Sequence, residues 1–222
     1  ITIAASIAVE KGFRDLMRVA IERYIMRRRD FYSLSFDEQY QVWLKYNRLS
    51  DRVVNRMREE ADRFQYRPKI SIVMPVYNTD SRWLKKAIDS VIRQLYADWE
   101  LCIADDGSTK KHVKTILEKY RLKDPRVKVV YLEKNLGIAA ASNAALMLAG
   151  GEFVGFLDHD DELTLDALYE VVKLLNEQPD IDYIYSDEDK MDLNGRRLEP
   201  FFKPDWSPDL MLTMNYVTHF SV

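Results

Sequence analysis

The sequence has little cysteine, no long hydrophobic run and no glycine fingerprint of a dinucleotide site. Cys102 is the single cysteine among 222 residues, so the chain can form no disulfide within itself. Because Cys102 lies in an apolar run, we expect a buried, inert thiol in a reducing, cytoplasmic setting. No apolar stretch reaches the roughly 20 residues that cross a bilayer, and no G-x-G-x-x-G pattern is present. The composition therefore favours a globular protein without a disulfide framework.

The two ends of the sequence suggest a piece of a longer protein. The start lacks an initiating Met and the basic flank of a signal peptide, and the end is an apolar, strand-like run. Charge is unevenly divided: residues 1–69 carry 15 basic and 10 acidic side chains, and the rest carry 18 and 26. We therefore expect any peripheral contact with the inner face of the plasma membrane, or with a partner protein, to involve the front of the chain.

The first 66 residues have the periodicity of helices. Apolar residues three and four apart over 12–29 predict an amphipathic helix that packs on a core, on a partner helix or on a membrane surface. Ser35 and Glu38 form a capping box for a second helix, and Ser50 begins a third. Pro68 ends this region. We expect a helical appendage over residues 1–66 and a second domain over 67–222, cut short at its C-terminus.

Strand and helix patterns alternate four times after residue 69. Apolar runs at 70–76, 99–104, 127–132 and 153–157 have strand length, and amphipathic helical patterns follow them. This alternation predicts an α/β fold, with a mostly parallel, Rossmann-like sheet and helices on both faces. The alternation stops after residue 185, and Asn194-Gly195 predicts a tight hairpin turn.

The fourth apolar run opens directly into acidic residues, among which Asp158 and Asp160 form an Asp-x-Asp pattern. Carboxylates that crowd together repel each other, and a divalent cation relieves the repulsion while it binds water or phosphate oxygens. The first interpretation is therefore a metal-bound diphosphate site. The alternative is that these acids only cap a helix that begins near Thr164 and complement its dipole.

Polar clusters follow three of the predicted strands. They are Tyr77-Asn78, Asp105-Asp106 and Asp158-His159-Asp160. In a doubly wound sheet the carboxyl ends of the strands share one edge, so these clusters can surround one ligand. Taken singly, each cluster could also be turn chemistry, because Asn, Asp, Gly and Ser favour turns for backbone reasons.

From residue 69 onward the sequence resembles the family 2 glycosyltransferases, which have the nucleotide-sugar-binding fold called GT-A. The resemblance is carried by residues 72–78, 105–109, 135–137 with 141–143, and 156–161, in the family's order. It covers about two thirds of the chain. Residues 185–190 and 202–209 also resemble a bacterial subgroup that builds surface polysaccharides, O-antigens and related rhamnose-containing glycans.

The resemblance implies roles for particular residues. Four would surround the nucleoside: Pro75, Val76, Tyr77 and Asn78. Asp106, with Asp105 beside it, would contact the base. Asp158 would face the ribose and assist Asp160, which would hold the Mn²⁺ or Mg²⁺ that bridges the diphosphate, with Asp161 nearby. Asn143 would line the site, or would be a buried Asn that bonds the backbone.

The resemblance also implies an inverting reaction, in which a base deprotonates the acceptor hydroxyl. We expect that base beyond Val222, with Asp187, Glu188 and Asp189 as weaker candidates. The alternative for these three acids is solvated loop charge. We expect His159 to be a structural neighbour of the metal ligands and His219 to be a core residue.

The predicted function is transfer of a sugar from a nucleotide-diphosphate donor to a growing bacterial glycan or lipid-linked glycan, with no role for nucleic acid. A phosphatase of the haloacid dehalogenase type is a rival, but its Asp-x-Asp follows the first strand, with Thr or Val where this chain has Glu162. A nucleotidyltransferase would need a glycine- and arginine-rich loop that is absent. The non-enzyme alternative is a nucleotide-sugar-binding or scaffolding fragment of a polysaccharide-assembly protein.

Overall fold

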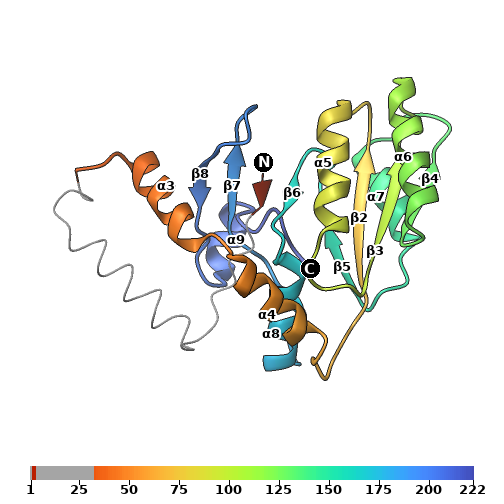
Figure 1. Ribbon diagram of the computed structural model, residues 1–222. Coiled ribbons are helices and arrows are strands. Elements are labelled where there is room, and N and C mark those ends of the chain that lie inside the picture. Colours follow the sequence, from red (N-terminus) through yellow and green to blue (C-terminus); the bar gives the residue numbers. More distant parts are fainter. Residues whose placement is uncertain (1, 4–32) are drawn as a thin grey trace.

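The computed structural model describes residues 2–3 and 33–222, and a four-stranded parallel sheet forms the right-hand part of the view in Figure 1. Its order is β4-β3-β2-β5. The strands are β2 (Ile70–Val76), β3 (Trp99–Asp105), β4 (Val127–Tyr131) and β5 (Phe153–Phe156). All three pairings are parallel. The chain winds outward from β2 to β4 and then returns to the other side of β2, so a topological switch point lies between β2 and β5. The predicted fold class is confirmed.

Helices cover both faces of this sheet. They are α5 (Ser81–Ile92), α6 (Lys111–Lys123), α7 (Ile138–Leu146) and α8 (Ala167–Glu177). Alternate side chains of a strand face opposite ways: Ile72 and Met74 join the main core with α5, α6 and α8, whereas Val73 joins a smaller core with α7. Cys102 is buried in the smaller core, and burial raises the pKa of its thiol to about 11. The prediction of a buried thiol is confirmed, and the raised pKa agrees with an inert one.

Within the described residues, two helices precede the parallel sheet, and both are predicted by the sequence. They are α3 (Phe36–Asn47) and α4 (Asp51–Ala61). The capping box at the start of α3 is present: Ser35 N donates to Glu38 Oε2 at 2.8 Å, and Glu38 N donates back to Ser35 Oγ at 3.4 Å. The helix predicted over 12–29 lies outside the described residues.

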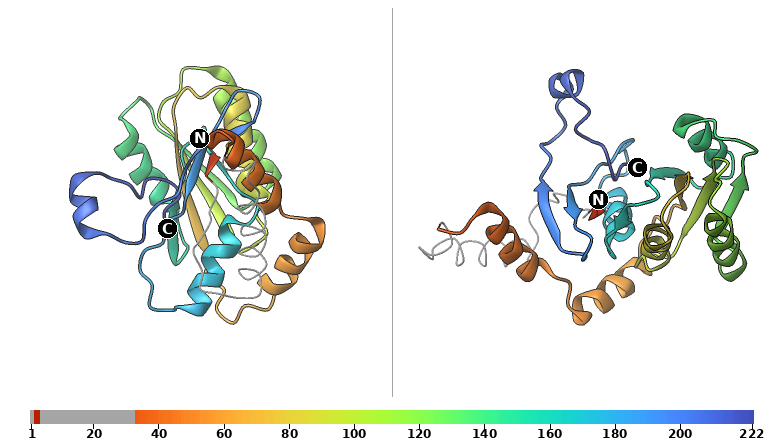
Figure 2. Two further views of the ribbon diagram at one scale, coloured as in Figure 1. Left: turned by 90° about the vertical axis from the view of Figure 1, so that its left-hand side faces the viewer. Right: turned by 90° about the horizontal axis from the view of Figure 1, so that it is seen from above.

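The helical front packs closely against later parts of the chain (Figures 1 and 2). Met57 and Ala61 of α4 are buried in the main core, and α4 lies beside α8. On α3, the rings of Tyr40 and Trp43 stack 5.7 Å apart, and both contact Phe202. The division into an appendage at 1–66 and a domain at 67–222 stays a prediction, since α4 shares its core with the second segment.

A second, smaller sheet has the order β6-β1-β7-β8. Its strands are β6 (Glu162–Leu163), β1 (Thr2–Ile3), β7 (Glu188–Met191) and β8 (Arg197–Phe201). The predicted hairpin turn joins β7 and β8, and Gly195 adopts a φ of 85° there. The short helix α9 (Pro208–Thr213) follows. None of the helices within the described residues has both the length and the apolarity needed to cross a membrane.

Candidate functional site

Hydrogen bonds tie the loop after β2 to the loop after β3. Asn78 N donates to Ser108 Oγ at 2.8 Å, and Asn78 Oδ1 accepts from the backbone N–H groups of Thr109 and Lys110 at 2.9 and 3.0 Å. Ser108 N in turn donates to Asp105 Oδ1 at 3.1 Å. Asn78 has a φ of 51°, which its short polar side chain tolerates. Two of the predicted polar clusters therefore meet at the carboxyl edge of the sheet.

Asp106 connects the end of β3 to the start of α7. Its carboxylate accepts from Leu136 N at 2.8 Å and from Gly137 N at 2.9 Å, and the residue is 2 % exposed. The same loops touch at Gly107, where an added Cβ would lie 2.6 Å from the backbone carbon of Lys134. Asp106 therefore holds the fold of this edge together. Its predicted contact with a base stays a prediction.

The other predicted nucleoside residues lie along the same edge. Pro75 and Val76 are buried at the end of β2, and Tyr77, directly after it, is 43 % exposed. Asn143 is exposed on α7, so the alternative of a buried Asn that bonds the backbone is wrong. Whether Asn143 and the residues of β2 contact a nucleotide stays a prediction.

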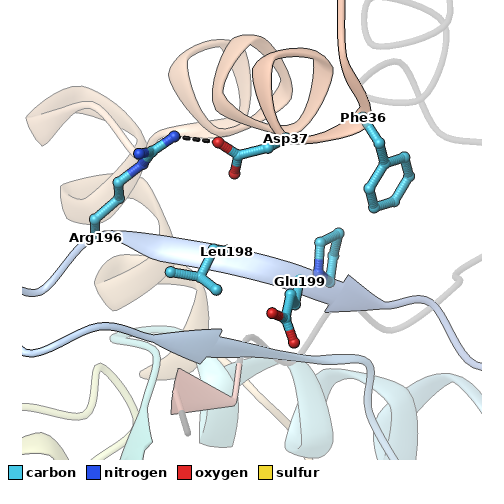
Figure 3. Close-up of a pocket in the computed structure, with 6 residues that line it drawn as sticks. Phe36, Asp37, Arg196, Leu198 and Glu199 are labelled. Carbon is cyan, nitrogen blue, oxygen red and sulfur yellow. Dashed lines mark hydrogen bonds and ion pairs between the residues drawn. The ribbon is translucent and has the colours of Figure 1, made fainter.

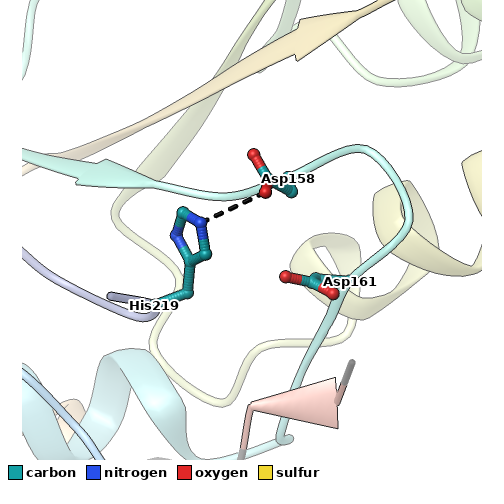
Figure 4. Close-up of side chains that lie close together, drawn as sticks. All are labelled: Asp158, Asp161 and His219. Atoms are coloured by element: carbon teal, nitrogen blue, oxygen red, sulfur yellow. Dashed lines mark ion pairs between the residues drawn. The ribbon is translucent and has the colours of Figure 1, made fainter. Parts of the chain in front are cut away.

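Three side chains converge beyond the end of β5: Asp158, Asp161 and His219 (Figure 4). One ligand atom from each lies within 4.8 Å of the others. His219 Nε2 is 3.2 Å from Asp158 Oδ2, and Asp161 is only 3 % exposed. The sequence pointed to Asp158, but the prediction that His219 is a core residue is wrong, because its ring reaches a carboxylate of the site.

The packing of the last residues against β5 brings His219 to this position. Phe156 N donates to Ser221 O at 3.1 Å, which attaches the C-terminal segment to the strand. The buried ring of Phe220 fits against Gly155, where an added Cβ would lie 2.6 Å from two ring atoms. A glycine inside a strand often marks such a close approach. Gly155 was therefore the one signal in the sequence that could have pointed to a segment packed here.

The pKa shifts of the three side chains follow from their contacts. The hydrogen bond between His219 and Asp158 lowers the pKa of Asp158 and raises that of His219, and burial opposes both shifts. Burial is also the main cause that raises the pKa of Asp161 to about 6. Asp158 is therefore held ionised, whereas Asp161 is ionised near neutral pH at a cost in desolvation.

The chemistry of these three groups fits a divalent cation. Two carboxylates provide the hard oxygen ligands that Mg²⁺ and Mn²⁺ bind, and the imidazole favours Mn²⁺, the softer ion. Among the described residues, His219 Nδ1 is a buried ring nitrogen without a hydrogen-bond partner. The cluster also lies at the switch point between β2 and β5, where ligands bind in open α/β sheets.

Asp160, the other predicted metal ligand, lies apart from this cluster. Its side chain is 58 % exposed, and His159 Nδ1 lies 3.6 Å from Asp160 Oδ1. The interpretation of these acids as helix caps is wrong, because β6 intervenes and α8 begins only at Ala167. Coordination of a metal by Asp160 stays a prediction.

The family model described as Glycosyl transferase family 2 matches residues 71–222. The chain belongs to glycosyl transferase family 2. The match begins in β2 and includes every residue that the sequence singled out for the site, from Pro75 to Asp189. It confirms the resemblance that the motifs indicated.

Relatives of the chain include bacterial proteins that are several times longer. The uncharacterized protein y4gI of Sinorhizobium fredii is 46 % identical over 170 residues, which are 77 % of this chain and 19 % of y4gI. The O-antigen biosynthesis protein RfbC of Myxococcus xanthus is 40 % identical over 169 residues, 76 % of this chain and 13 % of RfbC. Residues 1–349 of TarS from S. aureus, solved in complex with UDP-GlcNAc, are 33 % identical, with a TM-score of 0.49 over 58 % of this chain and 36 % of that TarS chain. The chain thus spans less than a fifth of the first two relatives.

Asp189, one of the three weaker candidates for the catalytic base, is turned away from solvent. It is 1 % exposed, and its Oδ2 accepts from the Tyr40 hydroxyl and from Arg197 Nε. The alternative of solvated loop charge is therefore wrong for Asp189. Because both partners are side chains of the protein, the carboxylate joins α3 to the β7–β8 hairpin, and its burial argues against contact with an acceptor.

The other two candidates are held by the segment after β8. Asp187 Oδ1 accepts from Lys203 N at 2.7 Å. Glu188 Oε2 accepts from Thr218 Oγ1 at 2.7 Å and pairs with Lys203 Nζ at 3.2 Å. Glu188 is therefore an ordered side chain, and its partner Thr218 precedes His219. A role as base for either acid stays a prediction.

A hollow of about 490 Å³ lies elsewhere, between α3 and β8 (Figure 3). Its lining residues are Phe36, Asp37, Arg196, Leu198, Glu199 and Pro200. An ion pair between Arg196 and Asp37 closes one side of it. None of the predicted site residues lines this hollow, so it is separate from the carboxyl edge of the parallel sheet.

Proposed function

We propose that this chain is the donor-binding part of an enzyme that transfers a sugar from a nucleotide diphosphate to a growing bacterial glycan. The observation that carries the proposal is the convergence of Asp158, Asp161 and His219 at the switch point of a family 2 glycosyltransferase domain. The name of RfbC, an O-antigen biosynthesis protein, supports a surface polysaccharide or its lipid-linked precursor as acceptor. We place the reaction in the cytoplasm, in keeping with a lone, reduced cysteine.

The proposed metal ligands are Asp158, Asp161 and His219. Asp158 also belongs to the pair predicted with Asp160, so it is common to both possible ligand sets. A bound Mn²⁺ or Mg²⁺ would neutralise the negative charge that grows on the departing diphosphate. Asp158 is suited to binding because His219 keeps it ionised, and the desolvation cost of an ionised Asp161 would be relieved by a cation. Asp160, on the exposed side of the loop, is proposed to face the diphosphate.

The nucleoside is proposed to lie against Tyr77 and Asn78, beside Asp105 and Asp106. Tyr77 offers an exposed ring on which a base or ribose can stack. The loops around it are fixed by the bonds of Asn78 and Asp106, which support a site that is formed before the ligand arrives. We further propose that the displacement inverts the anomeric centre, as the resemblance to the family implies.

Calorimetry with UDP, GDP and dTDP, each with and without Mn²⁺, tests this proposal. We expect one nucleotide to bind with Mn²⁺ and to bind much more weakly without it. Asp158→Ala should reduce the metal-dependent affinity by at least about 100-fold, because it removes a direct ligand. Asp180→Ala, at an exposed position outside the site, should bind as the wild type does.

The two ligand sets differ in their response to substitution. If the cation is held by the cluster, His219→Ala should weaken Mn²⁺ binding more than Asp160→Ala does. The reverse order would favour the pair Asp158 and Asp160. A folded wild-type sample that binds no nucleotide under any of these conditions would contradict donor binding and would favour a scaffolding role.

A further inference from the structure

Lys203 is a lysine with a buried charge near the proposed metal site. Its side chain is 1 % exposed, and it lies two residues after the end of β8. Lysine is almost never fully buried unless its charge is paired, because desolvation of an ammonium group is costly. Burial indeed lowers the pKa of Lys203, and the neighbouring Glu188 carboxylate opposes that shift. Its partners therefore explain why a charge is kept at this position.

The ammonium group of Lys203 has partners for all three of its protons. Nζ donates to Val217 O at 2.8 Å and to His219 O at 2.7 Å, and it lies 3.2 Å from Glu188 Oε2. Three donors are the full capacity of a lysine. Lys203 Nζ therefore has no proton left for a nucleotide or an acceptor.

These bonds fix the short segment that presents His219. The two carbonyl groups that Lys203 binds lie on either side of Thr218, and the Thr218 hydroxyl donates to Glu188 Oε2 at 2.7 Å. Thr218 has a φ of 23°, a strained value for a β-branched residue, so this backbone needs external contacts to persist. Lys203 and Glu188 together supply them.

The Lys203 network and the site meet at His219. On one side of this residue its carbonyl oxygen binds Lys203, and on the other its ring nitrogen lies 3.2 Å from Asp158 Oδ2. Phe220, the next residue, is anchored against Gly155. The segment is thus held at its far end by β5 and at its near end by Lys203, with the imidazole between them.

We propose that Lys203 is a positioning residue, which holds the 217–219 backbone so that the His219 ring stays against Asp158 and Asp161. Its functional consequence rests on the proposed function, because it acts through a ligand of the proposed metal site. This role requires no contact between Lys203 and the donor. It sets the orientation of His219 in the way that partners behind a metal ligand fix that ligand's geometry.

Hydrogen exchange and Mn²⁺ titration of the 222-residue chain test this inference in Lys203→Met. We expect amide exchange in a peptide covering 215–222 to become about tenfold faster, with no change in peptides from β2 and β3. We expect Mn²⁺ affinity, followed by the electron paramagnetic resonance of free Mn²⁺, to fall about tenfold, within the range found for residues that orient metal ligands. Lys203→Arg keeps the charge, so it should restore part of the slow amide exchange and part of the Mn²⁺ affinity.

Lys190→Met is the matched control, since Lys190 also carries an ion pair on the β7–β8 hairpin but is 59 % exposed. It should leave exchange and Mn²⁺ affinity unchanged. If Lys203→Met does not fold, Thr218→Val carries the test. This variant removes only the hydroxyl bond to Glu188 and should accelerate exchange in the same peptide.

A double variant decides whether Lys203 acts through His219. In the His219→Ala background, Lys203→Met should cause no further loss of Mn²⁺ affinity, and additive losses would overturn the inference. Unchanged exchange and unchanged Mn²⁺ affinity in Lys203→Met would overturn it as well. A wild type that binds no Mn²⁺ would refute the proposed function, whereas the exchange of residues 215–222 would still decide whether Lys203 holds the segment.

Discussion

Asp106 and Asp161 are both buried aspartates that follow strands of the same parallel sheet, but their surroundings differ. Asp106, 2 % exposed, accepts backbone N–H groups from Leu136 and Gly137 on its two oxygens. Asp161, 3 % exposed, lies beside Asp158 and His219, and burial raises its pKa to about 6. The protein compensates the buried charge of the first with its own backbone. The second lies in the proposed metal site, beside another carboxylate and an imidazole.

The comparison shows how one edge of a sheet serves both fold and site. Backbone N–H groups that point at Asp106 fix the loops around the predicted nucleoside position, and no ligand is needed for that order. The desolvation cost of ionising Asp161 is borne by the folded state, and a bound cation would offset it. An acidic pattern in a sequence can therefore mean either a structural joint or a binding site.

Asp106→Ala should have the largest effect on stability. It leaves two partly buried backbone N–H groups without their acceptor, at roughly 1–3 kcal/mol each, so we expect a loss of about 4 kcal/mol in the free energy of unfolding. The melting temperature should fall by about 10 °C. Urea denaturation followed by circular dichroism measures the change, with Asp180→Ala as the exposed control. A loss no larger than that of the control would mean that Asp106 does not hold these loops.

Asp161 should give the next largest effect, which is a dependence of the free energy of unfolding on pH. Its folded-state pKa of about 6 is above the ordinary value of about 3.9, so the folded state binds the proton more tightly. Its contribution to stability is complete below about pH 4 and is lost as the pH rises through 6, a change of about 2 to 3 kcal/mol. Asp161→Asn should remove this dependence.

The difference in unfolding free energy between wild type and Asp161→Asn, measured from pH 4 to pH 7.5, isolates this effect from that of the other acids. As the pH rises, the variant should become more stable relative to the wild type. Mn²⁺ should stabilise the wild type at pH 7.5 more than the variant, as expected for a ligand that binds only the folded state. A difference that does not vary with pH would show that burial does not raise the pKa of Asp161.

Gly155→Ala should have a moderate effect on stability and on Mn²⁺ affinity. It disturbs the cluster around Asp161 and leaves the loops around Asp106 in place. The added methyl group would lie 2.6 Å from the Phe220 ring, so the ring and the His219 segment must shift. Overpacking of this kind costs about 2 kcal/mol, and Mn²⁺ affinity should fall because His219 moves. Gly150→Ala, whose methyl group would meet its nearest neighbour at 3.7 Å, is the control. Normal Mn²⁺ affinity in Gly155→Ala would show that this packing does not position His219.

Tyr40→Phe should have the smallest effect and extends the comparison to a third buried aspartate. Asp189 lies between the other two cases: burial raises its pKa, and the Tyr40 hydroxyl and Arg197 oppose that shift. Removal of the hydroxyl should cost about 1 kcal/mol. Differential scanning calorimetry measures it, against Tyr46→Phe at an exposed position. If both variants melt together, the bond from α3 adds nothing to stability.

Local patterns in the sequence predicted much of the fold. The capping box of Ser35 and Glu38, the apolar strands and the Asn194-Gly195 turn act over a few residues, and each is present. The position of Asp158 followed from the topology, because an acid directly after a parallel strand must lie at the carboxyl edge. These features could be predicted because their causes are local.

The part of the site that the sequence did not predict depends on contacts between distant residues. His219 reaches Asp158 because Phe220 packs on Gly155 and Lys203 binds the backbone of 217–219, and apart from Gly155 no local pattern points to these contacts. The docking of α3 on the β7–β8 hairpin through Tyr40 and Asp189 is of the same kind. Acids that looked like solvated loop charge are therefore ordered partners.

Diffraction from crystals soaked with Mn²⁺ and UDP tests the central claim most directly, through the anomalous signal of the metal. We predict a single strong peak within coordination distance of the carboxylates of Asp158 and Asp161 and of a ring nitrogen of His219. A peak bound to Asp160 while His219 remains paired with Asp158, or a peak away from this edge of the sheet, would contradict the account.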